Sequence, residues 1–111
     1  MRVQLLSLAA GVVLVAAPPL ATARPVAAAA ASKCSGSYVC TWSKADFTGT
    51  KYSYNNDNGC YPRSGRSVSN QTGKRITVYR DASCYGDHFD IQTGHYSAKT
   101  PWPVVSMAVW G

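Results

Sequence analysis

The chain has 111 residues, of which 46% are hydrophobic and 14% charged, and its formal net charge is +6. A chain of this length has room for one hydrophobic core and therefore one domain. Its basic residues are scattered rather than gathered in a stripe with aromatic residues, which argues against a nucleic-acid partner.

The N-terminal segment predicts a signal peptide over residues 1–23. Arg2 precedes an apolar run over residues 3–17, which is too short to span a bilayer and is followed by two prolines. The small-x-small pattern Ala21-Thr22-Ala23 then predicts the cut, although further alanines at 27–31 offer cleavage sites as late as residue 31. We therefore expect a secreted, extracellular protein with no membrane segment after the signal is removed.

The remainder is expected to be a flexible leader over residues 24–33 and one domain over residues 34–111. Counted from Ser32, nine basic and five acidic residues give a mature charge of +4. Such a modest charge favours an ordinary solvated surface, and it is compatible with weak attraction to anionic cell-wall or membrane polymers. We expect a monomer.

Four cysteines in an exported chain predict two disulfides, because small secreted domains need covalent support. Four cysteines allow three pairings. We favour Cys34–Cys40, which closes a tight local loop, and by elimination Cys60–Cys84. The cysteine spacing does not fit a zinc site, because no pair has two to four intervening residues.

The rest of the domain has β character. After the predicted signal it contains no Leu or Glu, and it is rich in Tyr, Trp, Val, Ile and Thr. Short alternating runs separated by turn residues predict strands, as in a sandwich. These runs are 38–43, 50–54, 66–69, 75–80, 86–91 and 104–110. Turns are expected at 55–59, 72–73 and 93–94.

An internal repeat divides the domain into two halves. Trp42, Phe47 and Gly49 recur as Tyr79, Cys84 and Gly86, each 37 residues later, and Ser67 recurs as Ser106, 39 residues later. Each unit then spans about 40 residues and four strands, too few to bury a face alone, so the two units are expected to pack together.

This arrangement resembles the βγ-crystallin Greek-key motif. The resemblance implies a two-motif Greek-key β-sandwich in which a folded hairpin needs an aromatic pair and a glycine, and a later serine bonds across to it. The roles fall on Trp42, Phe47, Gly49 and Ser67, and then on Tyr79, Gly86 and Ser106. Cys84 replaces the usual aromatic residue, and its disulfide is expected to substitute for the aromatic packing.

The segment from Cys34 to Ser43, followed by Phe47-x-Gly49, is similar to the opening of small secreted actinobacterial proteins of peptidase inhibitor family I36. Residues 66–73 and 78–86 are also typical of that group. The resemblance implies a proteinase inhibitor that blocks a peptidase active site with a loop. In the founding inhibitor a short mid-chain disulfide holds that loop, and this sequence has no such pair there.

The residues give little support for catalysis or cofactor binding. His88 and His95 are the candidate neutral-pH bases, but no serine lies in a nucleophile motif and no carboxylate pair suits glycoside chemistry. The resemblance places calcium ligands just before Ser67 and Ser106, where this chain has Pro62-Arg63 and Pro101-Trp102. We therefore predict a non-enzyme without metal or cofactor; the Asn55–Asn58 run is interpreted as a turn rather than a metal site.

Two segments are candidate inhibitory or binding loops. One is 61–65, with Tyr61, Pro62 and Arg63 beside Cys60, and the other is 96–103, with Tyr96 and Trp102. The partner would be an extracellular peptidase. The alternative is an antimicrobial, killer-toxin-like protein that binds cell-wall polysaccharide through exposed aromatic residues, namely Tyr52, Tyr54, Tyr61, Tyr85, Tyr96 and Trp102.

Overall fold

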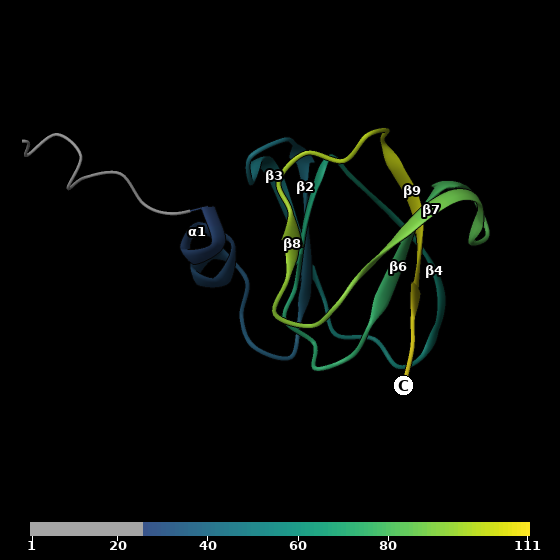
Figure 1. Ribbon diagram of the computed structural model, residues 1–111, viewed down its shortest axis with the longest axis horizontal. Coiled ribbons are helices and arrows are strands. Elements are labelled where there is room, and N and C mark those ends of the chain that lie inside the picture. Colours follow the sequence, from purple (N-terminus) through teal and green to yellow (C-terminus); the bar gives the residue numbers. More distant parts are fainter. Residues whose placement is uncertain (1–25) are drawn as a thin grey trace, which may run out of the picture.

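The computed structural model describes residues 26–111; the predicted signal peptide and its cut after Ala23 lie outside this range. The described chain forms a short helix and two four-stranded antiparallel sheets that face each other (Figure 1). In chain order the elements are α1 (Val26–Lys33), β2 (Val39–Lys44), β3 (Thr48–Tyr54), β4 (Gly59–Gly65), β5 (Ser67–Asn70), β6 (Ile76–Asp81), β7 (Tyr85–Ile91), β8 (Tyr96–Ser97) and β9 (Val104–Val109).

The two halves of the chain exchange one strand each. The sheet orders are β3-β2-β5-β8 and β4-β9-β6-β7, so the third strand of each repeat pairs with the last strand of the other. β8 adds to β5 through Ser69↔Tyr96, and β4 adds to β9 through Cys60↔Ala108. This exchange confirms the predicted all-β Greek-key sandwich and ties the halves into one domain.

The core lies between the sheets. Alternate side chains of the strands point inward, as the period of two requires. Its buried members are Val39, Val68, Ile76, Val78, Ile91, Val104, Met107 and Val109, with Tyr54, Tyr61, Phe89 and Trp102 packed at its margin. Burial of this aliphatic set is the main stabilising term, at about 25 cal/mol for each Å² removed from water.

Six predicted strands are present within two residues of their expected ends, but the sequence pattern does not predict β4 and β8. β4 contains Pro62 between Gly59 and Gly65, a composition that argues against a central strand. The structure accommodates the proline because β4 is an edge strand, where a missing N–H disturbs no ladder on its outer side. β8 has two residues and carries no readable alternation.

The structure also differs from the flexible leader expected over residues 24–33. Val26–Lys33 form a helix, for which a run of alanines has the highest propensity. The helix lies on the outer face of the first sheet, away from the second (Figure 1), and buries Ala30 against Trp42 and Phe47. None of the described residues belongs to a helix long and apolar enough to cross a membrane.

Candidate functional site

The first folded hairpin connects β2 to β3 and is closed by a buried serine. Asp46 and Phe47 both have positive φ (58° and 59°), followed by Gly49 at 83°. The Phe47 amide donates to Ser67 Oγ at 3.0 Å, and that hydroxyl donates to the Lys44 carbonyl at 2.7 Å. The serine therefore supplies both the acceptor and the donor that this turn needs.

The second hairpin, between β6 and β7, repeats this geometry. Ser83 and Cys84 have positive φ (61° and 56°), and Gly86 follows at 87°. The Cys84 amide donates to Ser106 Oγ at 2.8 Å, and Ser106 Oγ donates to the Asp81 carbonyl. The two hairpins are thus equivalent in backbone and in hydrogen bonding.

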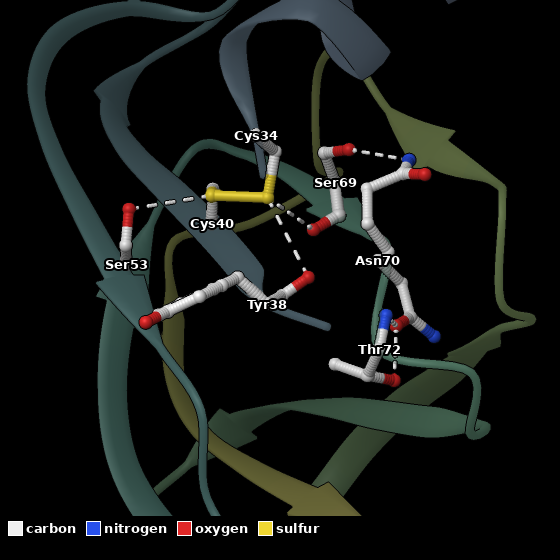
Figure 2. The surroundings of a disulfide bond; sticks show 8 residues. Cys34, Tyr38, Cys40, Ser53, Ser69, Asn70 and Thr72 are labelled. Carbon is white, nitrogen blue, oxygen red and sulfur yellow. Dashed lines mark hydrogen bonds between the residues drawn. A yellow bond between two sulfur atoms is a disulfide. The ribbon is translucent and has the colours of Figure 1, made fainter. Parts of the chain in front are cut away.

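The structure contains the two favoured disulfides. Cys34–Cys40 ties the segment after α1 to β2, and Figure 2 shows the Cys34 sulfur against the carbonyl oxygens of Tyr38 and Ser69, at 3.5 and 3.8 Å. Those are contacts rather than hydrogen bonds, because a disulfide sulfur has no proton to donate. The Ser53 hydroxyl, 3.4 Å from the Cys40 sulfur, is the donor on the other side.

The Cys60–Cys84 disulfide takes the place of an aromatic contact. In the first sheet the hairpin residue Phe47 meets Tyr96 of β8 edge-to-face, with ring centroids 5.8 Å apart. Tyr96 pairs with Ser69, and Cys60 pairs with Ala108, which is 39 residues after Ser69. The disulfide therefore joins the equivalent positions of the second sheet covalently.

The candidate segment 61–65 is not a loop. It lies within β4, where Tyr61 pairs with Met107 and Pro62 with Ser106. Tyr61 packs against the core, and its hydroxyl donates to the Asp57 carbonyl at 2.8 Å. The Arg63 guanidinium carbon lies 3.9 Å from the centroid of the Tyr54 ring. The expectation of a free inhibitory loop here is wrong, because the strand exchange draws this segment into the second sheet.

The candidate segment 96–103 begins as strand β8 and ends as a true loop. Tyr96 is in the strand and contacts Phe47, and the Trp102 ring is 5.6 Å from that of Phe89. These aromatic side chains support the fold. Tyr96 is nevertheless 39% exposed, and in the loop that follows, the exposed residues are Lys99, Pro101 and Pro103.

Hydrogen bonds hold the loop backbone on both sides of Lys99. The Ala98 carbonyl accepts from the Asp46 amide at 2.7 Å. Thr100, 1% exposed, donates its amide to the Arg66 carbonyl at 2.9 Å, and its own carbonyl accepts from Arg66 Nη2 at 3.1 Å. The Thr100 hydroxyl also donates to the Trp102 carbonyl at 2.7 Å. Lys99 thus projects from a backbone that is anchored immediately before and after it.

Lys99 and Thr100 lie within the candidate segment 96–103, but the sequence pattern singles out neither of them, nor Arg66. Arg66 reads as a strand residue, and Lys99 as one of several scattered bases. The available signal was the dipeptide Thr100-Pro101, since the residue before a proline is restricted to an extended backbone.

A family model for peptidase inhibitor family I36 matches residues 27–91 of this chain. The chain belongs to peptidase inhibitor family I36. It is accordingly a peptidase-inhibitor-type protein and not an enzyme. The match spans the first repeat and half of the second, so β3 and β4 lie inside it and the 98–103 loop lies beyond it.

Among solved structures, this I36 member is similar to the N-terminal domain of protein S. The TM-score is 0.55 at 17% identity, and the alignment covers 67% of this chain and 96% of that one. At this identity the likeness concerns the fold, which is of the βγ-crystallin type. No curated protein gives a significant match.

His88 and the 55–58 turn of the I36 member have structural contacts. The His88 ring lies against Tyr79, with centroids 5.3 Å apart, and its Nδ1 is 3.0 Å from the Gly86 carbonyl. In the 55–58 turn, Asn56 accepts from Arg63 and Asn58 from Lys74. Over residues 26–111, no group of three or more His, Cys, Asp or Glu side chains converges as a metal site would require.

Proposed function

We propose that this protein is a secreted inhibitor that enters the active-site cleft of an extracellular peptidase with the 98–103 loop. The observation that supports the proposal is the anchoring of Ala98 and Thr100 on either side of the exposed Lys99. The two disulfides suit an oxidising, extracellular compartment.

The physical argument is preorganisation. A peptidase binds its substrate in an extended form, and a flexible peptide loses conformational entropy when it is ordered there. The 98–103 loop has already lost that entropy on folding, so less of its contact energy is spent on ordering. Pro101 and Pro103 restrict the backbone further by fixing φ.

The loop suggests which peptidases to test. Lys99 is the exposed side chain between the two anchored residues, so it is the side chain placed to enter a specificity pocket. An ammonium group on a flexible stem favours a pocket that contains a carboxylate. We therefore expect the strongest inhibition among peptidases that accept a basic residue.

The experiment titrates the purified protein against one metallo-, one serine and one cysteine peptidase that cleave beside basic residues. Lys99→Ala should weaken inhibition at least about tenfold, equivalent to about 1.4 kcal/mol, and Lys99→Arg should retain most of it. Lys51→Ala is the matched control, because Lys51 is an exposed lysine on β3. Absence of inhibition at micromolar concentration in all three classes, or equal inhibition by Lys99→Ala and wild type, would remove this assignment.

A second candidate function is binding of cell-wall polysaccharide, and exposed tyrosines favour it. Tyr85 is 75% exposed and Tyr52 45% exposed, and Tyr52 stacks with Tyr54 at a 16° interplanar angle. Flat exposed rings suit the apolar faces of sugars. Sedimentation with insoluble chitin or peptidoglycan tests it: retention that is lost in Tyr52→Ser and Tyr85→Ser would support it, and no retention would exclude it.

A further inference from the structure

An open groove of about 490 Å³ lies on the outer face of the second sheet, beside the folded hairpin between β6 and β7. Its lining includes Ala108, Tyr79, Trp110 and both residues of the Cys60–Cys84 disulfide. Trp110 is 41% exposed, and the Asn58 side chain lies beside Gly111, which also lines the groove. Asn58 of the 55–58 turn forms part of the lining, and no residue of the 98–103 loop does.

The internal repeat shows what fills the equivalent place in the first sheet. Trp42 corresponds to Tyr79 and Phe47 to Cys84. Over these two residues lies α1, whose Ala30 is 1% exposed and packs with Trp42, Phe47 and the Cys34–Cys40 disulfide. As a result Trp42 is 2% exposed.

The contact of α1 combines a small apolar side chain with a cation one turn later. Ala30 enters the cluster, and Lys33, three residues on and on the same face, donates its Nζ to the Phe47 carbonyl at 2.9 Å. The residue equivalent to Phe47 is Cys84, which lines the open groove. The contact of α1 with the first sheet therefore indicates what kind of segment would fit the equivalent groove on the second sheet.

We propose that the groove binds a short helix of a partner protein that presents an alanine-sized side chain followed, one turn later, by a lysine or arginine. The small side chain would rest on Ala108 between Tyr79 and Trp110, and the cation would reach the hairpin. This is a docking surface separate from the loop of the proposed function.

Charges around the groove favour such a helix in one orientation. Asp81 begins the hairpin and is exposed, where the first repeat has Lys44 at the equivalent position. At the other end, Lys74 donates to Asn58, and the Arg75 guanidinium carbon lies 5.2 Å from the Trp110 ring centroid. A helix with acidic residues in its first turn and a base in its last matches both ends, and it also suits its own dipole.

The test is an NMR titration of the mature protein (24–111) with a synthetic peptide that carries the sequence of residues 26–33 behind a Ser-Pro-Glu-Glu cap. Binding should be saturable, with a dissociation constant below about 1 mM. It should shift the Trp110 indole N–H and the amides of residues 79, 84 and 108, and leave the Trp42 indole unchanged. A peptide with Lys33→Glu should bind at least about tenfold more weakly.

Two groove variants and a control complete the experiment. Ala108→Leu fills the floor and Trp110→Ala removes a wall, and both should abolish the shifts, while Tyr85→Ser should bind as wild type does. The absence of saturable shifts would overturn the proposal, as would unchanged binding to both groove variants. Shifts centred on Trp42 would mean that the peptide displaces α1, and concentration-dependent self-association through Trp110 would assign the groove to a second copy; either would overturn it. Peptidase inhibition should be the same in all these variants.

Discussion

Replacement of Ser67 by alanine tests how the folded hairpins are held. Ser67 is 0% exposed, accepts from the Phe47 amide at 3.0 Å and donates to the Lys44 carbonyl at 2.7 Å. Alanine leaves the Phe47 amide without an acceptor beside a side chain that is 2% exposed. A buried unsatisfied donor costs about 1–3 kcal/mol, and the second lost bond adds about 1, so we expect about 2–4 kcal/mol of destabilisation.

The equivalent change in the second repeat should cost less. Ser106→Ala removes the same two bonds, but Asp81 and Ser83 of that hairpin are exposed, so water can reach the freed groups. The Cys60–Cys84 disulfide also keeps that hairpin in place. We expect about 1–2 kcal/mol. Ser43→Ala is the control, because Ser43 Oγ accepts from Thr50 on the exposed side of the first hairpin, and it should cost about 1 kcal/mol or less.

Urea unfolding followed by tryptophan fluorescence measures all three variants. With a slope of about 1 kcal/mol/M for a domain of this size, Ser67→Ala should lower the midpoint by about 2 M or more. A loss for Ser67→Ala no larger than that for Ser43→Ala would refute the closing role of the hydroxyl. A larger loss for Ser106→Ala than for Ser67→Ala would refute the argument from burial.

Three further predictions concern the scaffold. Gly49→Ala should destabilise the protein by more than about 2 kcal/mol, because the added Cβ would meet Ser43 Oγ and the backbone has a φ of 83°. Gly73→Ala, at a φ of 85° with open space around it, should cost about 1 kcal/mol. Equal losses of thermal stability in the two variants would contradict a steric contribution from Ser43. Cys60→Ser with Cys84→Ser should cost about 3 kcal/mol and Cys34→Ser with Cys40→Ser about 2 kcal/mol, because the paired cysteines are 24 and 6 positions apart in the sequence. Urea midpoints in the reverse order would contradict the chain-entropy estimate. Removal of residues 26–33 should expose Trp42 and shift its fluorescence to longer wavelength. The measurement uses a Trp102→Phe, Trp110→Phe background, in which Trp42 is the remaining tryptophan. An unchanged spectrum would show that α1 does not cover Trp42.

Much of the fold was readable because it is encoded locally. The alternating runs predicted six strands, since a strand with one face in the core must alternate. The spacing of Trp42, Phe47 and Gly49 and its recurrence at Tyr79, Cys84 and Gly86 indicated the two hairpins through the resemblance to the Greek-key motif, in which the glycine takes a positive φ. The short spacing of Cys34 and Cys40 favoured that disulfide, and Cys60–Cys84 followed by elimination.

The candidate site was less readable, because exposure is decided by packing. The sequence favours Tyr61, Tyr96 and Trp102 as aromatic residues in connecting segments, yet Tyr61 packs on the core, Tyr96 contacts Phe47, and Trp102 packs against Phe89. Whether a tyrosine or tryptophan in such a segment is structural depends on a neighbour about 13 to 50 residues away. Lys99 is exposed because Arg66, 33 residues earlier, holds Thr100 in place.

The amino-acid sequence alone was enough to establish the class of this protein: a small, two-repeat, disulfide-bonded β domain of family I36. Alternation, glycine placement and cysteine spacing act over a few residues and leave a direct trace in the chain. The tertiary structure decided what the repeats do for each other: β4 and β8 exchange sheets, α1 covers one hairpin face and leaves the other open, and a disulfide stands where the first repeat has an aromatic contact. Those features depend on pairings between distant segments, whose free energy comes from burial that no local pattern records.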